Sequence, residues 1–237
     1  MAESRALLML SGGIDSTYCM YQALTAGRSL AVHHIHLVNR EGRSDAERRA
    51  VSQILRWFRR KGLTNFTYTE STFDYGTVRH IAKDYAVYSL MIGILLQDPR
   101  YRDIKSFIHP RHSDAFNLRK GQTFESASRR ANSVLTGVSK LVANREIGME
   151  LPIVGMTKKQ VIEACPPDLL RLTWYCRRPR KSGSVFYPCN SCFTCSQVNL
   201  AGGTKRTNTT ASRRTVRTRQ PARKTPAVAR ATHTSHR

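Results

Sequence analysis

The sequence of 237 residues contains no hydrophobic run near the length that a membrane-spanning helix needs. It also shows no secretory signal, because residues 1–5 are mostly polar and the apolar run after them is short. Acidic residues are scarce: 16 Asp and Glu stand against 39 Lys and Arg, which gives a net charge of +23. We therefore expect a cytoplasmic protein without membrane contact, whose partners are polyanions such as nucleic acid or phosphate-rich substrates.

Acidic residues are absent from the last segment. Residues 201–237 hold ten Lys or Arg, and removing those ten from the net charge of +23 leaves +13 for residues 1–200. The segment also has too few large apolar residues to offset the entropy of ordering. We predict one domain over 1–200 and a disordered basic tail over 201–237. Such a tail would bind nucleic acid without sequence preference, or serve only as a solubility extension or tether.

The most informative stretch is 7–16, which reads Leu-Leu-Met-Leu-Ser-Gly-Gly-Ile-Asp-Ser. Its four apolar residues predict a strand buried on both faces. The two glycines permit a positive φ and a close approach of the backbone to a ligand. Asp15 and Ser16 are expected to cap a helix over 17–26. A helix N-terminus beside glycine amides favours an anion, and phosphate is its natural ligand.

The string from 11 to 17 has no lysine like that of a Walker P-loop, so a P-loop kinase or GTPase is disfavoured. Ser-Gly-Gly-Ile-Asp-Ser-Thr, directly after the first strand, resembles the PP-loop of the ATP pyrophosphatase superfamily. That resemblance implies ATP binding and cleavage between the α and β phosphates; the alternative is a well-capped turn without a ligand. The residues expected to hold ATP are Leu10, Ser11, Gly12, Gly13, Ile14, Asp15, Ser16 and Thr17.

Strand-like and helix-like segments alternate along the rest of the domain. Further strands are predicted at 30–38, at 65–69 and ending at 107–108, and helices at 44–61, 78–97 and 125–142. This alternation predicts an α/β fold with a doubly wound parallel sheet. Ligands of such sheets bind beyond the carboxyl ends of the strands.

The loop after the fourth predicted strand, residues 109–114, should therefore face a ligand. Asp114 is its only acidic residue, and Arg111 and His112 are candidate partners for a phosphate or a carboxylate. Each of them alone would fit an exposed loop equally well. Together they make this loop a candidate for substrate contact.

A further basic residue lies at the start of a predicted helix. An extended piece over 151–159 leads into this helix, which Thr157 would cap. Lys158 then lies at the positive end of the helix, where a cation is unfavourable unless an anion is near. A bound phosphate would supply that anion; the alternative is a solvated lysine.

The chain has only six cysteines, which in a cytoplasmic protein are expected to be thiols, metal ligands or catalysts rather than disulfides. Cys189, Cys192 and Cys195 are each separated by two residues, and Cys176 precedes them across a loop. Four such thiolates satisfy tetrahedral Zn²⁺, with an iron–sulfur cluster as the rival. We predict a zinc-binding lobe over about 172–198, and buried, inert roles for the other two cysteines.

Together these motifs resemble the 7-cyano-7-deazaguanine synthase family of the PP-loop superfamily. The resemblance extends over residues 6 to about 200. It rests on the PP-loop at 11–16, on the segment 152–158 that begins with Pro and ends in Lys, on Leu-Thr-Trp-Tyr-Cys at 172–176, and on the cysteine cluster. A PP-loop alone is shared with tRNA thiolases, NAD synthetase and GMP synthetase, and the four cysteines narrow the resemblance.

The resemblance implies an ATP-dependent carbon–nitrogen ligase. The carboxylate of 7-carboxy-7-deazaguanine would attack the α-phosphate of ATP, ammonia would convert the adenylate to an amide, and a second ATP would dehydrate that amide to the nitrile. Asp15, Ser16 and Lys158 would be catalytic: Ser16 with Ser11 would hold pyrophosphate, Asp15 would contact Mg²⁺, and Lys158 would stabilise developing charge. Asp114 and Arg111 remain the candidate substrate contacts, and we expect a homodimer.

Two loops that recognise the base in that family are missing from this sequence. The Pro-Gly-Arg-Asn loop before the helix at 78–97 is absent, and the family's Asp-Tyr-Ser-Gly-Tyr-Pro-Asp-Cys-Arg loop is replaced by residues 113–116 and a basic stretch. The product is therefore either the nitrile or 7-amido-7-deazaguanine. The alternatives are a tRNA-modifying PP-loop enzyme such as a thiolase, and a nucleic-acid-binding protein whose ATP site has decayed.

Overall fold

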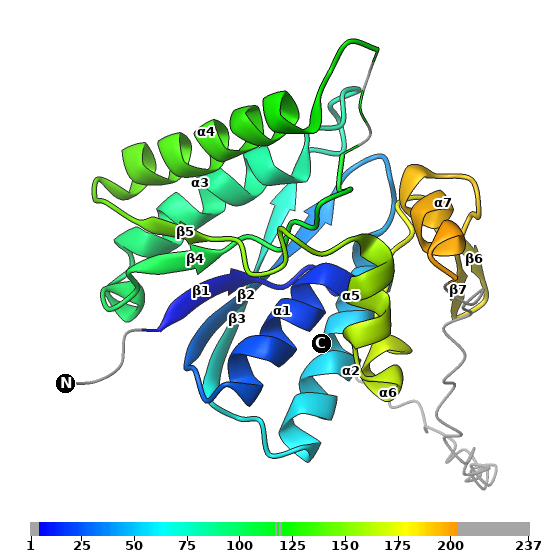
Figure 1. Ribbon diagram of the computed structural model, residues 1–237, viewed down its shortest axis with the longest axis horizontal. Coiled ribbons are helices and arrows are strands. Elements are labelled where there is room, and N and C mark those ends of the chain that lie inside the picture. The colour runs from blue at the N-terminus through cyan, green and yellow to red at the C-terminus, as the bar shows by residue number, and fades with distance from the viewer. Residues whose placement is uncertain (1–4, 117, 119, 203–237) are drawn as a thin grey trace, which may run out of the picture.

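The computed structural model describes residues 5–116, 118 and 120–202 (Figure 1). The predicted tail lies outside the described residues from position 203 onward. The strands are β1 (Ala6–Met9), β2 (Leu30–Val38), β3 (Phe66–Asp74), β4 (Ser106–Ile108), β5 (Gly148–Glu150), β6 (Arg180–Ser182) and β7 (Val185–Tyr187). The helices are α1 (Ile14–Thr25), α2 (Ser44–Arg60), α3 (Asp84–Gln97), α4 (Phe124–Ala143), α5 (Lys158–Ala164), α6 (Pro167–Leu170) and α7 (Phe193–Leu200), with the short 3-10 helix η1 (Pro99–Tyr101).

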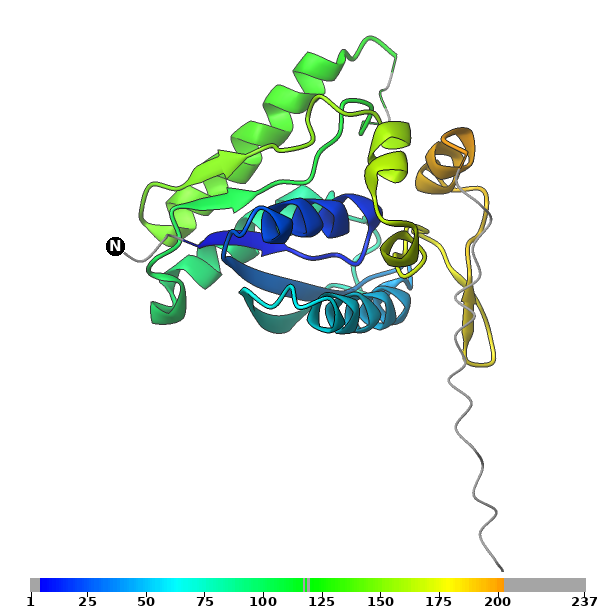
Figure 2. The same ribbon diagram turned by 60° about the horizontal axis from the view of Figure 1, so that its bottom comes forward.

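Five strands form one parallel sheet in the order β3-β2-β1-β4-β5. β1 lies in the middle, where Leu8 is opposite Val32 of β2 on one side and Ile108 of β4 on the other. Helices cover both faces of this sheet (Figures 1 and 2). The predicted doubly wound α/β fold is therefore confirmed. Strand order reverses between β1 and β4, so the ligand crevice typical of such sheets lies beyond their carboxyl ends.

Side chains of β1 and of Leu10 directly after it alternate between two apolar cores. Ala6, Leu8 and Leu10 pack with α1, α2, α5 and α6 on one face of the sheet. Leu7 and Met9 pack with α3 and α4 on the other face. All five are buried, which explains why this strand reads as an unbroken apolar run.

Several boundaries differ from those predicted. β3 continues to Asp74 beyond the predicted 65–69, because it pairs with β2 along its whole length. α3 begins at Asp84, six residues after the predicted start at 78. The strand near the predicted extended piece 151–159 is β5, which pairs with β4 and ends at Glu150.

The start of α1 corrects the predicted helix over 17–26. The helix begins at Ile14, and its N-cap is Gly13, which makes no side-chain capping hydrogen bond. Asp15 and Ser16 therefore lie in the first turn and are not caps. Because neither side chain is needed to close the helix, both remain available at the mouth of the loop.

The segment with the four cysteines lies beyond the carboxyl ends of the sheet strands (Figures 1 and 2). This cysteine segment runs from Trp174 through the antiparallel β6–β7 hairpin to the end of α7. Trp174 joins it to the first loop, because its backbone N–H donates to the carbonyl of Gly12 at 2.8 Å. Among the described helices, none combines the length and the apolar character required to span a bilayer.

Candidate active site and metal centre

The turn between β1 and α1 needs glycine at position 12. Gly12 has φ of +79°, in the left-handed region that favours glycine. A Cβ there would lie 3.1 Å from the backbone oxygen of Glu47 and 3.1 Å from Cγ2 of Val51. α2 is therefore packed directly against the loop and fixes its path.

The hydroxyls of Ser11 and Ser16 lie side by side across this turn, 3.1 Å apart. Ser11 Oγ accepts from the N–H of Gly13 at 3.2 Å, and Ser16 Oγ donates to the carbonyl of Gly13 at 3.3 Å. The first N–H groups of α1 have no acceptor within the helix. These amides and the two hydroxyls form a cradle that suits phosphate oxygens.

Asp15 and Lys158 form an ion pair at the mouth of this cradle. Nζ of Lys158 lies 2.6 and 2.7 Å from the two carboxylate oxygens, although the residues are 143 positions apart. The side chain of Lys158 is only 8% exposed, so the alternative of a solvated lysine is wrong. The carboxylates of Asp15 and Asp114 are the anions near the start of α5, and Thr157 caps that helix as predicted.

His112 and Asp114 extend this pair into a four-residue cluster. Nδ1 of His112 donates to Oδ1 of Asp114 at 2.7 Å, and the backbone N–H of Lys158 donates to the same oxygen at 2.8 Å. Nε2 of His112 lies 3.8 Å from Oδ2 of Asp15. We call Asp15, His112, Asp114 and Lys158 the mouth cluster.

The protonation of the mouth cluster follows from burial and charge. Burial lowers the pKa of His112, and the carboxylate of Asp15 opposes this only in part, so the ring is neutral at neutral pH. Partial burial alone would raise the pKa of Asp114, but the hydrogen bonds from Lys158 N–H and His112 lower it. With Nδ1–H donating to Asp114, Nε2 of His112 carries a lone pair that can accept a proton.

Arg111, the other predicted substrate contact, is not brought to this cluster. Its guanidinium bonds Asn132 of α4 and lies 5.7 Å from the ring centroid of Phe116, and the residue is buried. The neighbouring His112 faces the loop in its place. The loop after β4 does lie beside the loop after β1, but which of its two adjacent side chains points toward Asp15 depends on the turn. Substrate contact by Asp114 and Arg111 stays a prediction.

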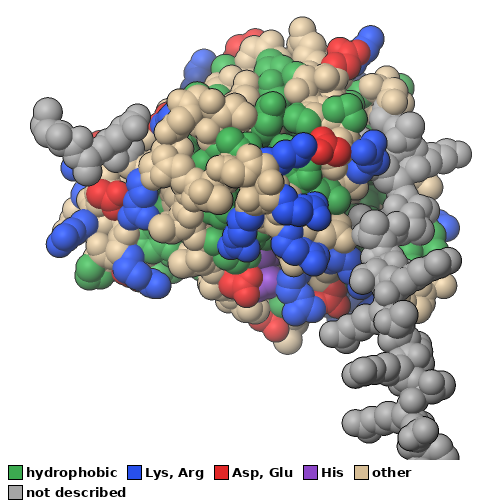
Figure 3. Space-filling model, turned by 90° about the horizontal axis from the view of Figure 1, so that it is seen from below, with side chains coloured by type: hydrophobic (Ala, Val, Ile, Leu, Met, Phe, Trp, Pro, Cys, Tyr) green, Lys and Arg blue, Asp and Glu red, His purple; other side chains and the backbone are tan. Residues whose placement is uncertain are grey.

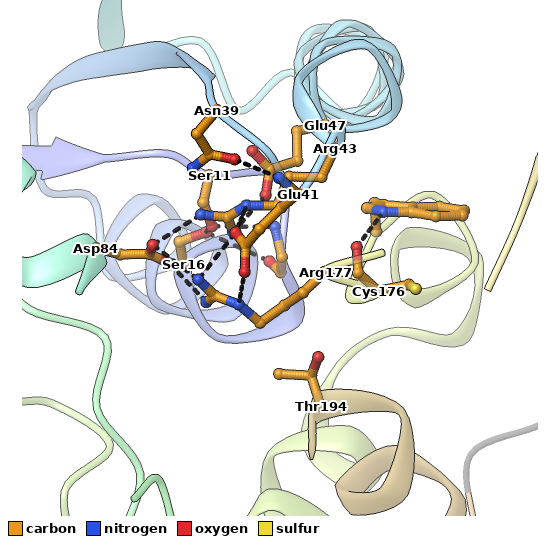
Figure 4. A network of polar contacts seen from close by, with 12 residues as sticks. Ser11, Ser16, Asn39, Glu41, Arg43, Glu47, Asp84, Cys176, Arg177 and Thr194 are labelled. Atoms are coloured by element: carbon orange, nitrogen blue, oxygen red, sulfur yellow. Dashed lines mark hydrogen bonds and ion pairs between the residues drawn. The ribbon is translucent and has the colours of Figure 1, made fainter. Parts of the chain in front are cut away.

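A second polar network lies beside Ser11 and Ser16 (Figure 4). Arg43 contacts the carboxylates of Glu41, Glu47 and Asp84 at 2.7 to 2.9 Å. Arg177 bonds Glu41 and Asp84 as well, at 2.6 and 2.9 Å. The network joins α2, α3 and the cysteine segment over the loop, and neither the charge pattern nor the motifs in the sequence indicated it.

This network holds three carboxylates against two guanidinium groups. Glu47 is the most deeply buried, and burial raises its pKa to about 7 even though Arg43 opposes the shift. Arg43 and Arg177 overcome burial at Asp84 and lower its pKa. Burial therefore makes Glu47 more ready to take up a proton than Asp84.

The four cysteines predicted as metal ligands are brought together. The Sγ atoms of Cys176, Cys189, Cys192 and Cys195 all lie within 4.8 Å of one another. Sγ of Cys195 is 3.9 Å from that of Cys189 and 3.4 Å from that of Cys192. A tetrahedral Zn²⁺ with bonds of about 2.3 Å places its sulfurs about 3.8 Å apart. The cluster therefore fits one ion with four thiolate ligands.

The comparison with known families gives one match. Residues 1–165 match the family described as thiamine biosynthesis protein (ThiI). The chain belongs to the ThiI family. A search among curated proteins found no match.

Membership of the ThiI family confirms the PP-loop superfamily prediction and supports ATP-dependent, nucleotide-modifying chemistry. It gives no support to the specific 7-cyano-7-deazaguanine synthase subfamily. The matched residues of the ThiI-family chain include the loop at 10–17 and Lys158, and they end before Cys176. The cysteine cluster is therefore a feature outside the matched part.

The two other cysteines of this ThiI-family chain are buried, as predicted. Cys19 and Cys165 are exposed by 1% and 2%, and both lie in the core beside α1 and α5. Since the chain has six cysteines in all, every thiol with partial solvent access belongs to the four-cysteine cluster. This distribution bears on any reaction that requires a free thiol.

Proposed function

We propose that this protein is an ATP-dependent ligase that adenylates an oxygen of a nucleobase substrate. The favoured substrate is 7-carboxy-7-deazaguanine, with ammonia as the second reactant. The observation that carries the proposal is the mouth cluster: a buried lysine paired with Asp15 stands at the edge of a phosphate cradle that has no Walker lysine. Such an arrangement supports attack at the α-phosphate with pyrophosphate as the leaving group.

The residues around the loop have separate roles in this adenylation. The α1 amides with Ser11 and Ser16 bind the departing pyrophosphate. Lys158 stabilises the negative charge that develops on the α-phosphate. Mg²⁺, when bound, neutralises polyphosphate charge, and Asp15 is the carboxylate placed to contact it. Both oxygens of Asp15 bond Lys158. For Asp15 to hold Mg²⁺, Lys158 would have to give up one of these oxygens, and its Nζ could then turn toward the phosphate.

His112 supplies a base for the second step. Ammonia attacks the acyl carbon of the adenylate, AMP leaves with the former carboxylate oxygen, and one proton must be removed from the nitrogen. The neutral ring of His112, oriented by Asp114, can accept that proton at Nε2. Repetition on the amide, with its oxygen adenylated by a second ATP and lost with AMP, gives the nitrile. Release after the first cycle gives the 7-amido product.

The cysteine cluster has a structural role in this proposal. Four thiolates around one Zn²⁺ leave no open position for water or substrate. The cluster instead holds the segment that carries Trp174 against Gly12. ATP chemistry would then depend on the metal only through the shape of the loop.

A second candidate is tRNA thiolation, which the ThiI family match favours. This reaction also begins with adenylation, but a sulfur donor replaces ammonia. With Cys19 and Cys165 buried, sulfur would have to come from the cluster or from another protein. The short distances between the four Sγ atoms favour one ion over a larger iron–sulfur cluster. The intact cradle and the Asp15–Lys158 pair argue against a decayed ATP site.

The test is mass spectrometry of the base formed from 7-carboxy-7-deazaguanine, ammonia and excess ATP. We expect the nitrile or the amide, and loss of at least 100-fold in turnover for Asp15→Asn, of the size typical when an electrostatic contact to the transition state is removed. The control is Asp98→Asn, because Asp98 pairs with Arg100 on the surface away from the cradle. Failure to convert this base, together with sulfur transfer to tRNA, would favour the second candidate.

A further inference from the structure

A groove of about 420 Å³ lies between α2 and the β6–β7 hairpin, separate from the ATP cradle. Its charged lining consists of Arg48, Arg49, Arg56 and Lys181 against the single acid Asp45. Figure 3, which views the molecule from below where α2 lies, shows Lys and Arg side chains gathered on this face. We call this feature the α2–hairpin groove.

Most of the positive charge in the groove is not neutralised by the protein. Arg48 pairs with Asp45 at 3.0 Å. In the part of the chain that the structure describes, no ion pair joins Arg49, Arg56 or Lys181 to an acidic side chain. Three cations are therefore left to attract an anion from solution.

The cations are nevertheless held in place. Arg49 donates to the carbonyl of Ser184 at the tip of the hairpin, and its guanidinium lies 5.1 Å from the ring centroid of Phe186. Nζ of Lys181 lies 5.5 Å from the same ring. The ring of Phe186 thus contacts one cation from α2 and one from the hairpin. Because these two side chains are already held, binding an anion here would cost little side-chain entropy.

The basic surface continues along α2 past the groove. Arg59 and Arg60 are exposed on the last turn, and the only acid after Asp45 on this helix is the buried Glu47. From Arg48 to Arg60 the helix rises by about 18 Å. A row of this length fits several successive phosphates of a nucleic-acid strand better than one small anion.

We propose that the α2–hairpin groove binds the phosphate backbone of a single-stranded nucleic acid. The groove lies behind the ATP cradle, because Phe186 packs on Trp174 at 6.2 Å and Trp174 bonds Gly12. A strand held there would be anchored one layer of residues from the loop. The proposal does not depend on which base the cradle activates.

The experiment measures binding of a fluorescently labelled single-stranded RNA to the full chain over a salt series from about 50 to 200 mM. The variant Arg56→Gln/Lys181→Gln removes two groove charges. The control Arg129→Gln/Arg130→Gln removes two exposed charges from α4, on the opposite side of the sheet. Both proteins keep residues 201–237, so any contribution of the basic tail is the same.

We expect the groove variant to bind several-fold more weakly. The slope of log affinity against log salt should fall in magnitude by about 1.4, since each phosphate contact to a single strand contributes about 0.7. The control should keep the wild-type slope, and both variants should retain the wild-type melting temperature and release of AMP. Equal losses in both variants would overturn the proposal, as would competition by polyglutamate at an equal concentration of charge.

Discussion

At the scale of single residues, position 12 tolerates no side chain. Gly12→Ala is expected to lower the free energy of unfolding by about 1–2 kcal/mol from backbone strain, with more from the contacts to Glu47 and Val51 at 3.1 Å. Those contacts should also displace the loop and reduce ATP turnover at least 100-fold. Urea unfolding and pyrophosphate release measure the two effects.

Gly27→Ala is the matched control. Gly27 has φ of +76°, but a Cβ there meets no atom within 4 Å. It should therefore show the strain without the loss of turnover. A similar loss of turnover in both variants would mean that strain alone, and not the close packing of α2 on the loop, explains the result.

A buried histidine links the loop to pH. Burial lowers the pKa of His34 from 6.5 to about 4, and its Nδ1–H donates to the carbonyl of Leu10 at 2.8 Å. Between these two pKa values the unfolded chain binds more protons than the folded one. The stabilisation is therefore complete above pH 6.5 and is lost as pH falls toward 4.

His34→Gln should reduce the acid destabilisation caused by buried histidines by roughly a quarter, because burial also lowers the pKa of His33, His109 and His112. The measurement is the free energy of unfolding in urea from pH 7 to 4.5. His80→Gln, the same substitution at an exposed position, is the control. An unchanged slope in His34→Gln would show that this ring does not contribute.

Single residues also show where sequence reasoning succeeds and where it stops. The common position of Ser11, Asp15 and Ser16 at the loop after β1 could be predicted, because all three belong to one short contiguous motif. The partner of Asp15 was not, because Lys158 is 143 positions away and only the fold brings it near. Lys158 itself was found from its unfavourable place at a helix N-terminus, a local signal with a physical cause.

At the scale of elements, the network around Arg177 joins α3 to the cysteine segment. Arg177 directly follows Cys176, one of the four predicted metal ligands. Arg177→Gln removes the bonds from this position to Glu41 and Asp84. We expect this variant to release zinc to a chromophoric chelator several-fold faster than wild type, because the segment loses its tie to the domain. Exposed Arg178→Gln is the control and should release zinc at the wild-type rate.

Equal release rates from wild type and Arg177→Gln would show that the cysteine segment is held by its own contacts. The buried hairpin residue Phe186 and its packing on Trp174 would then carry the attachment. The metal content before chelation should be identical in all three proteins, since no ligand is changed.

Whether a segment forms a helix or a strand was predicted more accurately than where it begins and ends. Apolar periodicity placed α2 and α4 within a residue or two of their ends. The pattern gave only the first part of β3, because its later residues are half exposed and owe their conformation to pairing with β2. α3 begins at Asp84, later than predicted, and its apolar pattern gives no sign of this boundary. Asp84 forms ion pairs with Arg43 and Arg177, and only the folded chain brings these residues together.

At the scale of the whole molecule, the cysteine cluster should decide whether the C-terminal part folds. Structural zinc contributes on the order of 10 kcal/mol. Cys189→Ser is therefore expected to lose bound zinc and to give a protein whose segment from Trp174 onward is cleaved rapidly by protease. Cys165→Ala, which removes a buried sulfur outside the cluster, should retain one zinc per chain.

Metal analysis with limited proteolysis checks this prediction. A protease-resistant Cys189→Ser protein without zinc would refute a structural role for the cluster. Iron with a visible absorption band in the wild-type protein would instead support an iron–sulfur cluster.

The fold class was accessible from the sequence because alternation of strands and helices and one strong motif agree. The arrangement of the candidate active site was harder to predict. Sequence placed the loops after β1 and β4 at one edge of the sheet, but the Arg43–Arg177 network and the α2–hairpin groove arise from segments that approach only in the folded chain. The net charge of +23 indicated a polyanionic partner without indicating where it binds.

In the proposed reaction, an oxygen of the substrate attacks the α-phosphate of ATP. The most direct measurement uses 7-carboxy-7-deazaguanine labelled with oxygen-18 in its carboxylate, together with ammonia and ATP, and follows the label by mass spectrometry. Adenylation transfers one labelled oxygen to AMP, and pyrophosphate is released without label. Formation of ADP with labelled inorganic phosphate would rule out adenylation, because it would place the attack on the terminal phosphate.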